Sequence, residues 1–224
     1  MKKLILLMCL IAFSSASFAQ NESDLAGVRL GATIGTQYSF MRYPADFIVN
    51  RVQGLGSFHA GAWMKVKVVD PLYVRVEGIY SQRNTKGDYV HQFQEDDGVW
   101  YFPIDSKVKD TFFEIPIIGE YYVTPEVSGY GGIHTAVLLN SDVTVDDATM
   151  AEVADNVDLT VEDITPPDRN NVEIGYILGI QYQVEPNIAV GCRLTRMLTT
   201  AYDIDQELDT RYGMYQFYLC IELN

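Results

Sequence analysis

The stretch VEIGYILGIQYQV, residues 172–184, decides the architecture of this chain. Its apolar side chains recur at every second position, so they share one face of an extended strand, while the glycines fall on the other face. A tight turn with proline chemistry follows at Glu185-Pro186-Asn187, and a second alternating segment begins at once. The strand is longer than the ~5–6 residues typical of soluble sheets and is long enough to cross a bilayer at a tilt.

The same period of two recurs along the chain and predicts eight strands. These strands span residues 28–40, 57–68, 72–81, 111–123, 129–139, 172–184, 188–198 and 212–223. Tight turns join some of them, at residues 70–71, 124–126 and 185–187, whereas the alternate connections are long, at residues 41–55, 82–110, 140–170 and 199–211. Short turns on one side and long loops on the other are typical of membrane barrels, with the short turns in the periplasm. We therefore predict an all-β fold, an eight-stranded antiparallel up-and-down transmembrane β-barrel with both termini at the periplasmic end.

The first 19 residues have the anatomy of a secretory signal peptide. Two lysines precede an apolar run, and the small residues around Ala19 predict cleavage after it. We expect a short N-terminal periplasmic segment, residues 20–26, and a barrel domain, residues 27–224. The apolar run is too short for a membrane anchor, which takes about 20 apolar residues. A lipoprotein signal ending at Cys9 is the alternative, although Met8 stands where a small residue is wanted.

Composition excludes some classes of function. The net charge of -14 becomes -16 when Lys2 and Lys3 are removed with the signal, and an acidic protein is a poor nucleic-acid binder. Two cysteines, Cys192 and Cys220, lie beyond the signal, too few for a disulfide scaffold. They fall on opposite faces of their predicted strands, so we expect both to be free.

Alternation alone does not say which face of the barrel sees lipid, because a soluble lipocalin-like carrier would turn its apolar face inward. Gly61-Ala62-Trp63 even imitates the lipocalin G-x-W pattern. Two features favour the apolar face outward. Glycine is frequent on the polar face, where it would make room in a narrow barrel, at Gly31, Gly35, Gly61, Gly175, Gly179 and Gly191.

The charges on that polar face nearly cancel, which suggests ion pairing across a lumen. The positive residues are Arg29, Lys65, Lys67, Arg75 and Arg193, and the negative residues are Glu77, Glu114, Glu120, Glu173 and Glu222. An ordinary solvated face with a chance balance is the alternative. Aromatic residues at strand ends are a weaker sign of interfacial girdles, at Tyr38, Phe40, Tyr80, Phe113, Tyr121 and Tyr182.

The segment FFEIPIIGEYY, residues 112–122, resembles the aromatic-x-E-I-P strand of PorT-like outer-membrane β-barrel proteins. GVRLG at 27–31 and VRVEGIYSQ at 74–82 are similar to other strands of that family. RLTRMLT at 193–199 also resembles a family segment, with Leu and Met replacing an aromatic residue and a glycine. The resemblance implies an eight-stranded outer-membrane barrel and little chemistry, since most members have no assigned role and only the namesake is tied to export of secreted proteases.

Pro116 cannot donate to a strand ladder, so we expect a bulge or local break that curves its strand. On the same strand, Glu114 and Glu120 are expected to point into the lumen and to meet Arg75 or Arg29.

Residues with catalytic or metal-binding potential are few. His59 and His134 are predicted to face the lumen and His91 lies in a loop, without the spacing of metal ligands. His134-Thr135 is the single histidine with a hydroxyl neighbour, and no G-x-S-x-G pattern occurs. The acidic loop 140–170 lacks the spacing of a calcium loop and reads as a solvated extracellular loop, with a short helix near 148–157. We expect no catalytic residue, metal or cofactor.

The sequence thus favours a monomeric, non-enzymatic barrel in outer-membrane lipid, with a lumen filled by side chains. Such a protein would have a structural or interaction role through its loops or its periplasmic end, in envelope assembly or protein secretion. The alternatives are a soluble lipocalin-like carrier, a small pore and an outer-membrane enzyme acting on lipid.

Overall fold

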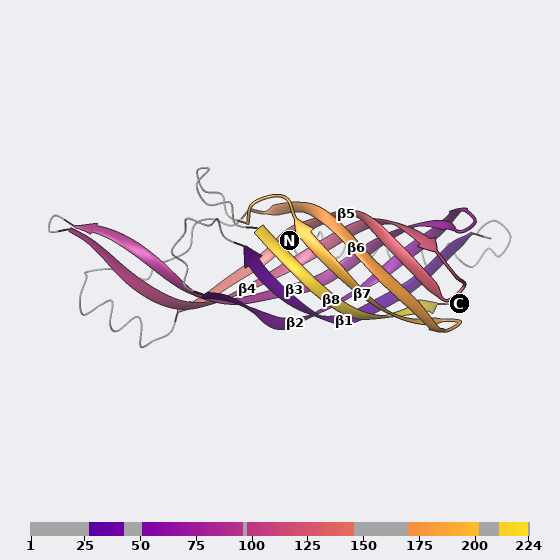
Figure 1. Ribbon diagram of the computed structural model, residues 1–224, viewed down its shortest axis with the longest axis horizontal. Helices are drawn as coiled ribbons and strands as arrows, with labels where there is room; N and C mark the ends of the chain where they lie inside the picture. The colour runs from indigo at the N-terminus through magenta and orange to yellow at the C-terminus, as the bar shows by residue number, and fades with distance from the viewer. Residues whose placement is uncertain (1–26, 43–50, 96–97, 146–169, 202–210, 224) are drawn as a thin grey trace.

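The computed structural model describes residues 27–42, 51–95, 98–145, 170–201 and 211–223 (Figure 1). They form eight strands in one closed antiparallel barrel, in which each strand pairs with its neighbours in sequence and β1 pairs with β8. The strands are β1 (Val28–Arg42), β2 (Arg51–Val69), β3 (Leu72–Glu95), β4 (Gly98–Tyr122), β5 (Val127–Val145), β6 (Val172–Glu185), β7 (Ile188–Met197) and β8 (Arg211–Leu223). The predicted fold class is confirmed.

The two ends of the barrel differ. The tight turns β2–β3, β4–β5 and β6–β7 lie at the same end as the C-terminus (Figure 1). The β2–β3 turn contains a cis peptide bond between Asp70 and Pro71. We call this end the turn end and the opposite one the loop end. In membrane barrels the short turns face the periplasm, so the loop end is the extracellular one.

The expected loop at 82–110 is wrong. Instead β3 and β4 continue as a long hairpin, paired from Asn84↔Lys109 to Glu95↔Gly98, which projects beyond the barrel (Figure 1). Part of the reason is visible in the sequence, because residues of high strand propensity recur beyond the polar stretch 82–88, at 89–90 and 99–102. β5 likewise runs to Val145, into the predicted loop 140–170. The helix predicted near 148–157 lies outside the described residues.

At Pro116 the predicted bulge does not occur, but the predicted alternative, a local break, does, because Ile115 and Pro116 pair with no residue of β3. The register of β4 against β3 is the same on both sides of Pro116, with Val76↔Ile117 before it and Ile79↔Glu114 beyond it. A register shift occurs instead against β5, between Thr111 and Phe112. This shift leaves one extra residue in β5, between Leu138 and Asn140. An extra residue of this kind bends its strand and increases the local twist.

The faces of the wall follow the alternation of the sequence. In β1, Thr33 and Gln37 are buried inside, whereas Ile34 between them is 56% exposed outside. In β8, Phe217 is 64% exposed between buried Gln216 and Tyr218. The apolar face is therefore the outer one, and this excludes a soluble carrier with an apolar lumen. No helix of the described residues is long and apolar enough to cross a membrane.

Candidate functional site

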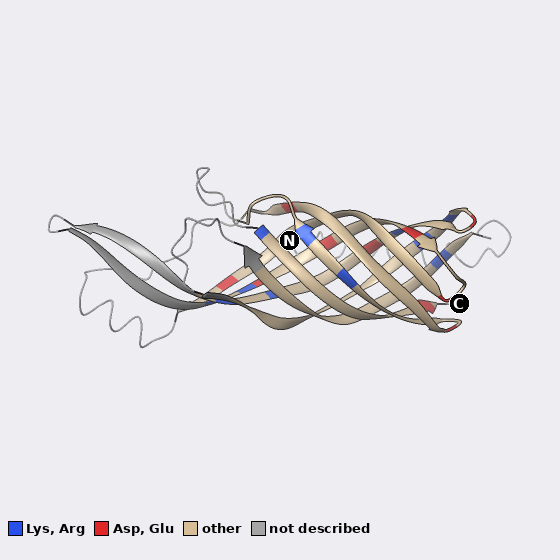
Figure 2. Ribbon diagram, viewed as in Figure 1, with Lys and Arg blue, Asp and Glu red and all other residues tan. Residues whose placement is uncertain are grey.

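Charged side chains from five strands, β2, β3, β4, β6 and β7, are buried in the lumen. Each is at most 3% exposed, although full burial of charge is rare unless the charges are paired. Figure 2 marks the charged residues along the strands of the barrel. The ion-paired set comprises four cations, Lys65, Arg75, Arg83 and Arg193, and four carboxylates, Glu77, Glu114, Glu120 and Glu173. The pairs form two clusters at different heights of the barrel.

The turn-end cluster consists of Lys65, Arg75, Glu77, Glu120 and Arg193. The Glu120 carboxylate lies 3.7 Å from Lys65 Nζ and 3.4 Å from Arg75 Nη1. Glu77 bridges two guanidinium groups, at 2.9 Å from Arg75 Nε and 2.7 Å from Arg193 Nη1. These five residues come from β2, β3, β4 and β7, so the cluster ties opposite sides of the wall together.

The loop-end cluster consists of Arg83, Glu114 and Glu173. The Arg83 guanidinium contacts Glu114 Oε1 at 2.8 Å and Glu173 Oε2 at 2.5 Å. It also stacks over the Phe112 ring, 3.9 Å from the ring centroid. A planar, forked guanidinium suits two carboxylates and an aromatic face together, which an ammonium group does not.

Amides and phenols connect the charged groups across the lumen. Gln216 donates to Gln37 at 2.6 Å and accepts from Arg193, while Gln37 donates to Ser81 at 2.8 Å. The hydroxyls of Tyr130 and Tyr218 share a hydrogen bond of 2.6 Å. Gln37 of β1 thus links β8 to β3, and the two tyrosines link β5 to β8. These side chains occupy the interior of the barrel.

Two clusters of buried apolar side chains pack beside the charged groups. Near the loop end the apolar cluster comprises Phe112, Ala136, Met197, Ala201, Tyr212 and Met214. The other comprises Trp63, Ile118, Tyr130, Ile177, Ala189, Tyr218 and Cys220. The interior of an eight-stranded barrel is just wide enough for side chains, so the apolar and ion-paired groups together fill it.

Glycines on the inner wall create the space for the larger side chains. Gly31 lies opposite Trp63, and a Cβ atom on Gly31 would come within 2.1 Å of the indole ring. Gly179 lies opposite Tyr130, and a Cβ atom there would come within 2.4 Å of the phenol ring. An aromatic ring laid across a glycine on the neighbouring strand fills the lumen and supports the glycine backbone.

The outermost predicted members of the charge set lie at the turn end. Arg29 and Glu222 approach to 3.5 Å, with the Arg29 side chain half exposed. Lys67 pairs with Asp70, which lies in the β2–β3 turn, at 2.7 Å on the surface. Both pairs are partly hydrated, so their contribution to stability is small.

One expected pairing is wrong. Glu120 meets Arg75, as the sequence suggested, but Glu114 meets Arg83 instead of Arg75 or Arg29. Arg83 is absent from the predicted set of lumen charges because the sequence predicts a loop from residue 82. The signal was present, since Glu77, Ile79, Ser81 and Arg83 continue the inward-facing period of β3.

His59 and His134 are fully buried in the lumen, as predicted. The loop position predicted for His91 is wrong, because His91 lies in β3, opposite Phe102 of β4. His134 Nε2 lies 3.4 Å from Glu114 Oε2. His59 lies opposite Gly35 and Ser81 in the sheet. No group of three or more His, Cys, Asp or Glu side chains within the described residues is arranged to hold a metal ion. Of the predicted acidic loop, Asp142 lies in β5, and its residues from 146 to 169 lie outside the described residues.

The lumen and the outward apolar face give a basis for comparison with known proteins. The sequence model of the outer membrane protein β-barrel domain matches residues 18–203, which include seven of the eight strands. The chain belongs to this family. It is an outer-membrane β-barrel protein, and its place is the cell outer membrane.

Solved structures with a similar barrel include three outer-membrane proteins. Ail, the attachment invasion locus protein of Yersinia pestis, is 13% identical, with a TM-score of 0.44 over 88% of this chain and 99% of Ail. Neisserial surface protein A is 12% identical, with a TM-score of 0.49 over 88% of this chain and 99% of its own. OprG from Pseudomonas aeruginosa is 9% identical, with a TM-score of 0.43 over 89% and 97%. A comparison with curated protein sequences found no match.

In this outer-membrane barrel, the apolar outer band contacts lipid. Aromatic side chains cluster on that face near the loop end, where Phe40 packs 5.3 Å from Tyr215 and Phe58 packs 6.1 Å from Tyr80 between ring centroids. Tyr121 and Tyr182 are exposed nearer the turn end. Aromatic residues at both edges of an apolar band match the interfacial girdles of membrane barrels.

The two cysteines of the barrel are free, as predicted. Cys220 is buried in the lumen beside the tyrosines, whereas Cys192 lies on the outer face. Their opposite orientation follows from the alternation of β7 and β8 and keeps the thiols apart.

Proposed function

We propose that the protein is a non-enzymatic barrel that acts through its two ends and not through its lumen. The observation that carries this proposal is the set of eight buried, mutually paired charges that crosses the interior. A conducting channel needs a water-filled passage, and water channels are found in barrels of about 16 strands, twice the number here. The small-pore alternative is therefore the weaker one.

The β3–β4 hairpin is the main candidate for an interaction element at the extracellular end. Within the described residues, β2 accompanies β3 only as far as Asp88, and β5 accompanies β4 only from Ser106. Seven rungs of the hairpin, from Tyr89↔Ile104 to Glu95↔Gly98, extend beyond these neighbours, a length of about 24 Å at the usual strand rise.

A two-stranded ribbon of this length offers backbone donors and acceptors along its edges. Such edges are templates for strand addition by an extended segment of another protein. Pro103 removes one donor from β4. In β3, residues Tyr89 to Glu95 include no proline, so we propose that a partner pairs with the β3 edge.

The experiment compares full-length protein with two variants after solubilisation from outer membranes. One variant replaces residues 89–104 by a two-residue Asn-Gly turn, which suits a tight hairpin. The other keeps the length of the hairpin and permutes its sequence. We expect all three to fold as heat-resistant barrels, and we expect a co-purifying envelope protein to be lost with the short hairpin. Unchanged co-purification with the short hairpin would contradict a role for this element.

We propose that this role is in envelope assembly or protein secretion, and the resemblance of residues 112–122 to PorT-like proteins supports this proposal. A deletion strain complemented with the short-hairpin variant tests it, because secretion should fail with the variant if the hairpin is the point of contact. Normal secretion in the deletion strain would exclude a secretion role. Lipid A mass spectra of the same strain test the enzyme alternative, which requires an altered lipid.

The domain boundaries also belong to this proposal. We propose that residues 1–19 are removed as a signal peptide and that residues 20–26 lie in the periplasm before β1. N-terminal sequencing of the mature protein should then begin at Gln20. We further propose a monomer, which light scattering of the detergent-solubilised barrel would check.

A further inference from the structure

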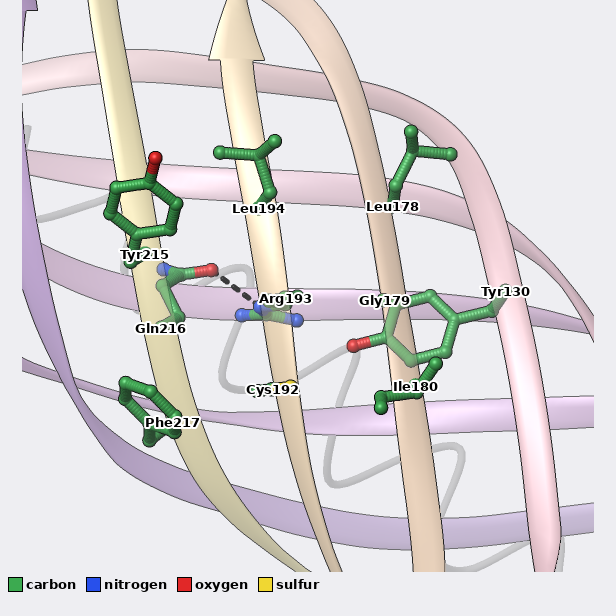
Figure 3. A pocket seen from close by; sticks show the side chains of 10 residues that line it. All are labelled: Tyr130, Leu178, Gly179, Ile180, Cys192, Arg193, Leu194, Tyr215, Gln216 and Phe217. Carbon is green, nitrogen blue, oxygen red and sulfur yellow. Dashed lines mark hydrogen bonds between the residues drawn. The ribbon is translucent and has the colours of Figure 1, made fainter.

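The outer wall of β6, β7 and β8 contains a groove of about 540 Å³, within the size range of small-molecule pockets (Figure 3). Two rows of outward side chains form it. Leu178, Leu194 and Tyr215 are opposite one another in one row, and Ile180, Cys192 and Phe217 in the next row toward the turn end. Cys192 is the smallest member, so the floor of the groove lies over it, between Ile180 and Phe217.

The loop-end side of this groove carries a cation. Arg196 is the next outward residue of β7 after Leu194, about 7 Å further along the strand. It is exposed, whereas its neighbours Thr195 and Met197 are buried in the lumen. Its side chain has no hydrogen bond or ion pair among the described residues, unlike the paired arginines of the lumen.

Arg196 lies in the part of the apolar band nearest the loop end, one row beyond Tyr215 of the aromatic pair Phe40 and Tyr215. On β6 its partner is Tyr176, and beyond it toward the loop end Ile174 and Leu198 are still exposed apolar side chains. On β8 its partner is Gly213, over which the Phe40 ring lies. A cation on the lipid face is costly near the midplane and is tolerated at the interface, where lipid headgroups begin.

We propose that this surface binds one phosphate-bearing lipid of the outer leaflet, with an acyl chain in the groove over Cys192 and the phosphate on Arg196. The two parts of the site match the two parts of such a lipid. The groove is apolar and open to the hydrocarbon region, and the Arg196 guanidinium, which pairs with none of the described residues, lies on its extracellular side. Arginine is well suited to phosphate because its forked donors bind two oxygens together. The site lies on a different surface from the β3–β4 hairpin and does not depend on the proposed role of that hairpin.

The test measures retained lipid by native mass spectrometry after mild detergent washing. The full-length barrel is refolded into vesicles of a phosphate-free galactolipid containing lipid A, and in parallel into vesicles of the same galactolipid containing dephosphorylated lipid A. We expect the protein to retain a single equivalent of lipid A and not to retain the dephosphorylated form. Arg196→Gln should lower retention by about tenfold or more, because a charge-assisted contact is lost.

Matched variants separate the two halves of the site. Cys192→Phe fills the groove and should also lower retention, whereas Ala62→Phe, on the outer face of β2, should leave it unchanged. Lys109→Gln removes an exposed cation of β4 and should likewise have no effect. Cys192→Leu replaces the larger substitution if the heat-resistant band shows that Cys192→Phe does not fold. Equal retention by Arg196→Gln and Lys109→Gln, or equal retention of the dephosphorylated lipid, would overturn the proposal.

Discussion

Removal of the Arg83 guanidinium is the sharpest perturbation of the lumen. In Arg83→Met, Glu114 and Glu173 keep their burial and both lose the cation that lies 2.8 and 2.5 Å away. Breaking a buried ion pair by removing one partner costs about 3–5 kcal/mol, since an uncompensated charge is left in the interior. Met keeps an unbranched side chain at this position but removes both the ion pairs and the guanidinium stacked on Phe112, so the loss is mainly electrostatic.

The assay is urea unfolding of the barrel in lipid vesicles, followed by the fluorescence of Trp63 and Trp100. With an unfolding slope of about 2 kcal/mol per molar urea, a loss of 3–5 kcal/mol moves the midpoint down by about 1.5–2.5 M. Lys109→Met is the matched control, because Lys109 is exposed on the outer face and should change the stability by less than about 0.5 kcal/mol.

A second substitution tests the same cluster from the carboxylate side. Glu114→Lys places a second cation against Arg83 and should prevent recovery of the heat-resistant form in detergent. A urea midpoint of Arg83→Met within 0.5 M of the wild-type midpoint, or normal refolding of Glu114→Lys, would show that the buried charges do not stabilise the barrel.

Two further results are expected. Gly179→Ala should destabilise the barrel by about 1–3 kcal/mol, because the added Cβ atom would lie 2.4 Å from the Tyr130 ring, whereas Gly129→Ala meets no atom within 4 Å and should be tolerated. Both variants are compared by urea midpoint, and equal midpoints would contradict the packing of rings on glycines. In the folded protein in detergent, a maleimide should modify Cys192 and should leave the buried Cys220 unmodified until the protein unfolds. Mass spectrometry measures the modification, and rapid modification of Cys220 would show that the lumen is open to solvent.

The sequence predicted the strands of the barrel well where a single rule applied. Alternation in β6, β7 and β8 located those strands to within a residue or so, because one lipid-facing side and one lumen-facing side force a strict period of two. The orientation of the faces followed from glycine and charge on the inner side. Small residues and balanced charges are needed in a narrow interior, where space and water are limited, and are not needed on a solvated surface.

Other features depended on contacts that lie far apart in sequence. The β3–β4 hairpin was read as a loop because residues 82–110 are polar at many positions, yet strand pairing continues through them. Arg83 was missed for the same reason, and with it the partner of Glu114. The break in the ladder at Pro116 was predictable because proline is a visible signal, whereas the register shift at Thr111 and Phe112 was not, because an extra residue in one ladder leaves no such signal.

The partners of individual lumen charges were also beyond the sequence. The charge balance on one face predicted that ion pairs exist, but not which residues form them. In the closed barrel β3 lies across the lumen from β7, so Glu77 pairs with Arg193, which is 116 positions away in the chain. Such a contact depends on the tilt and stagger of all eight strands together.

Current recording across a planar lipid bilayer tests the central claim most directly. The reconstituted wild-type barrel, with its lumen closed by ion-paired and apolar side chains, should give no discrete conductance steps at neutral pH in either polarity. Stable unitary steps from the folded, heat-resistant protein would contradict the account, because they require a continuous aqueous path where the described side chains fill the interior.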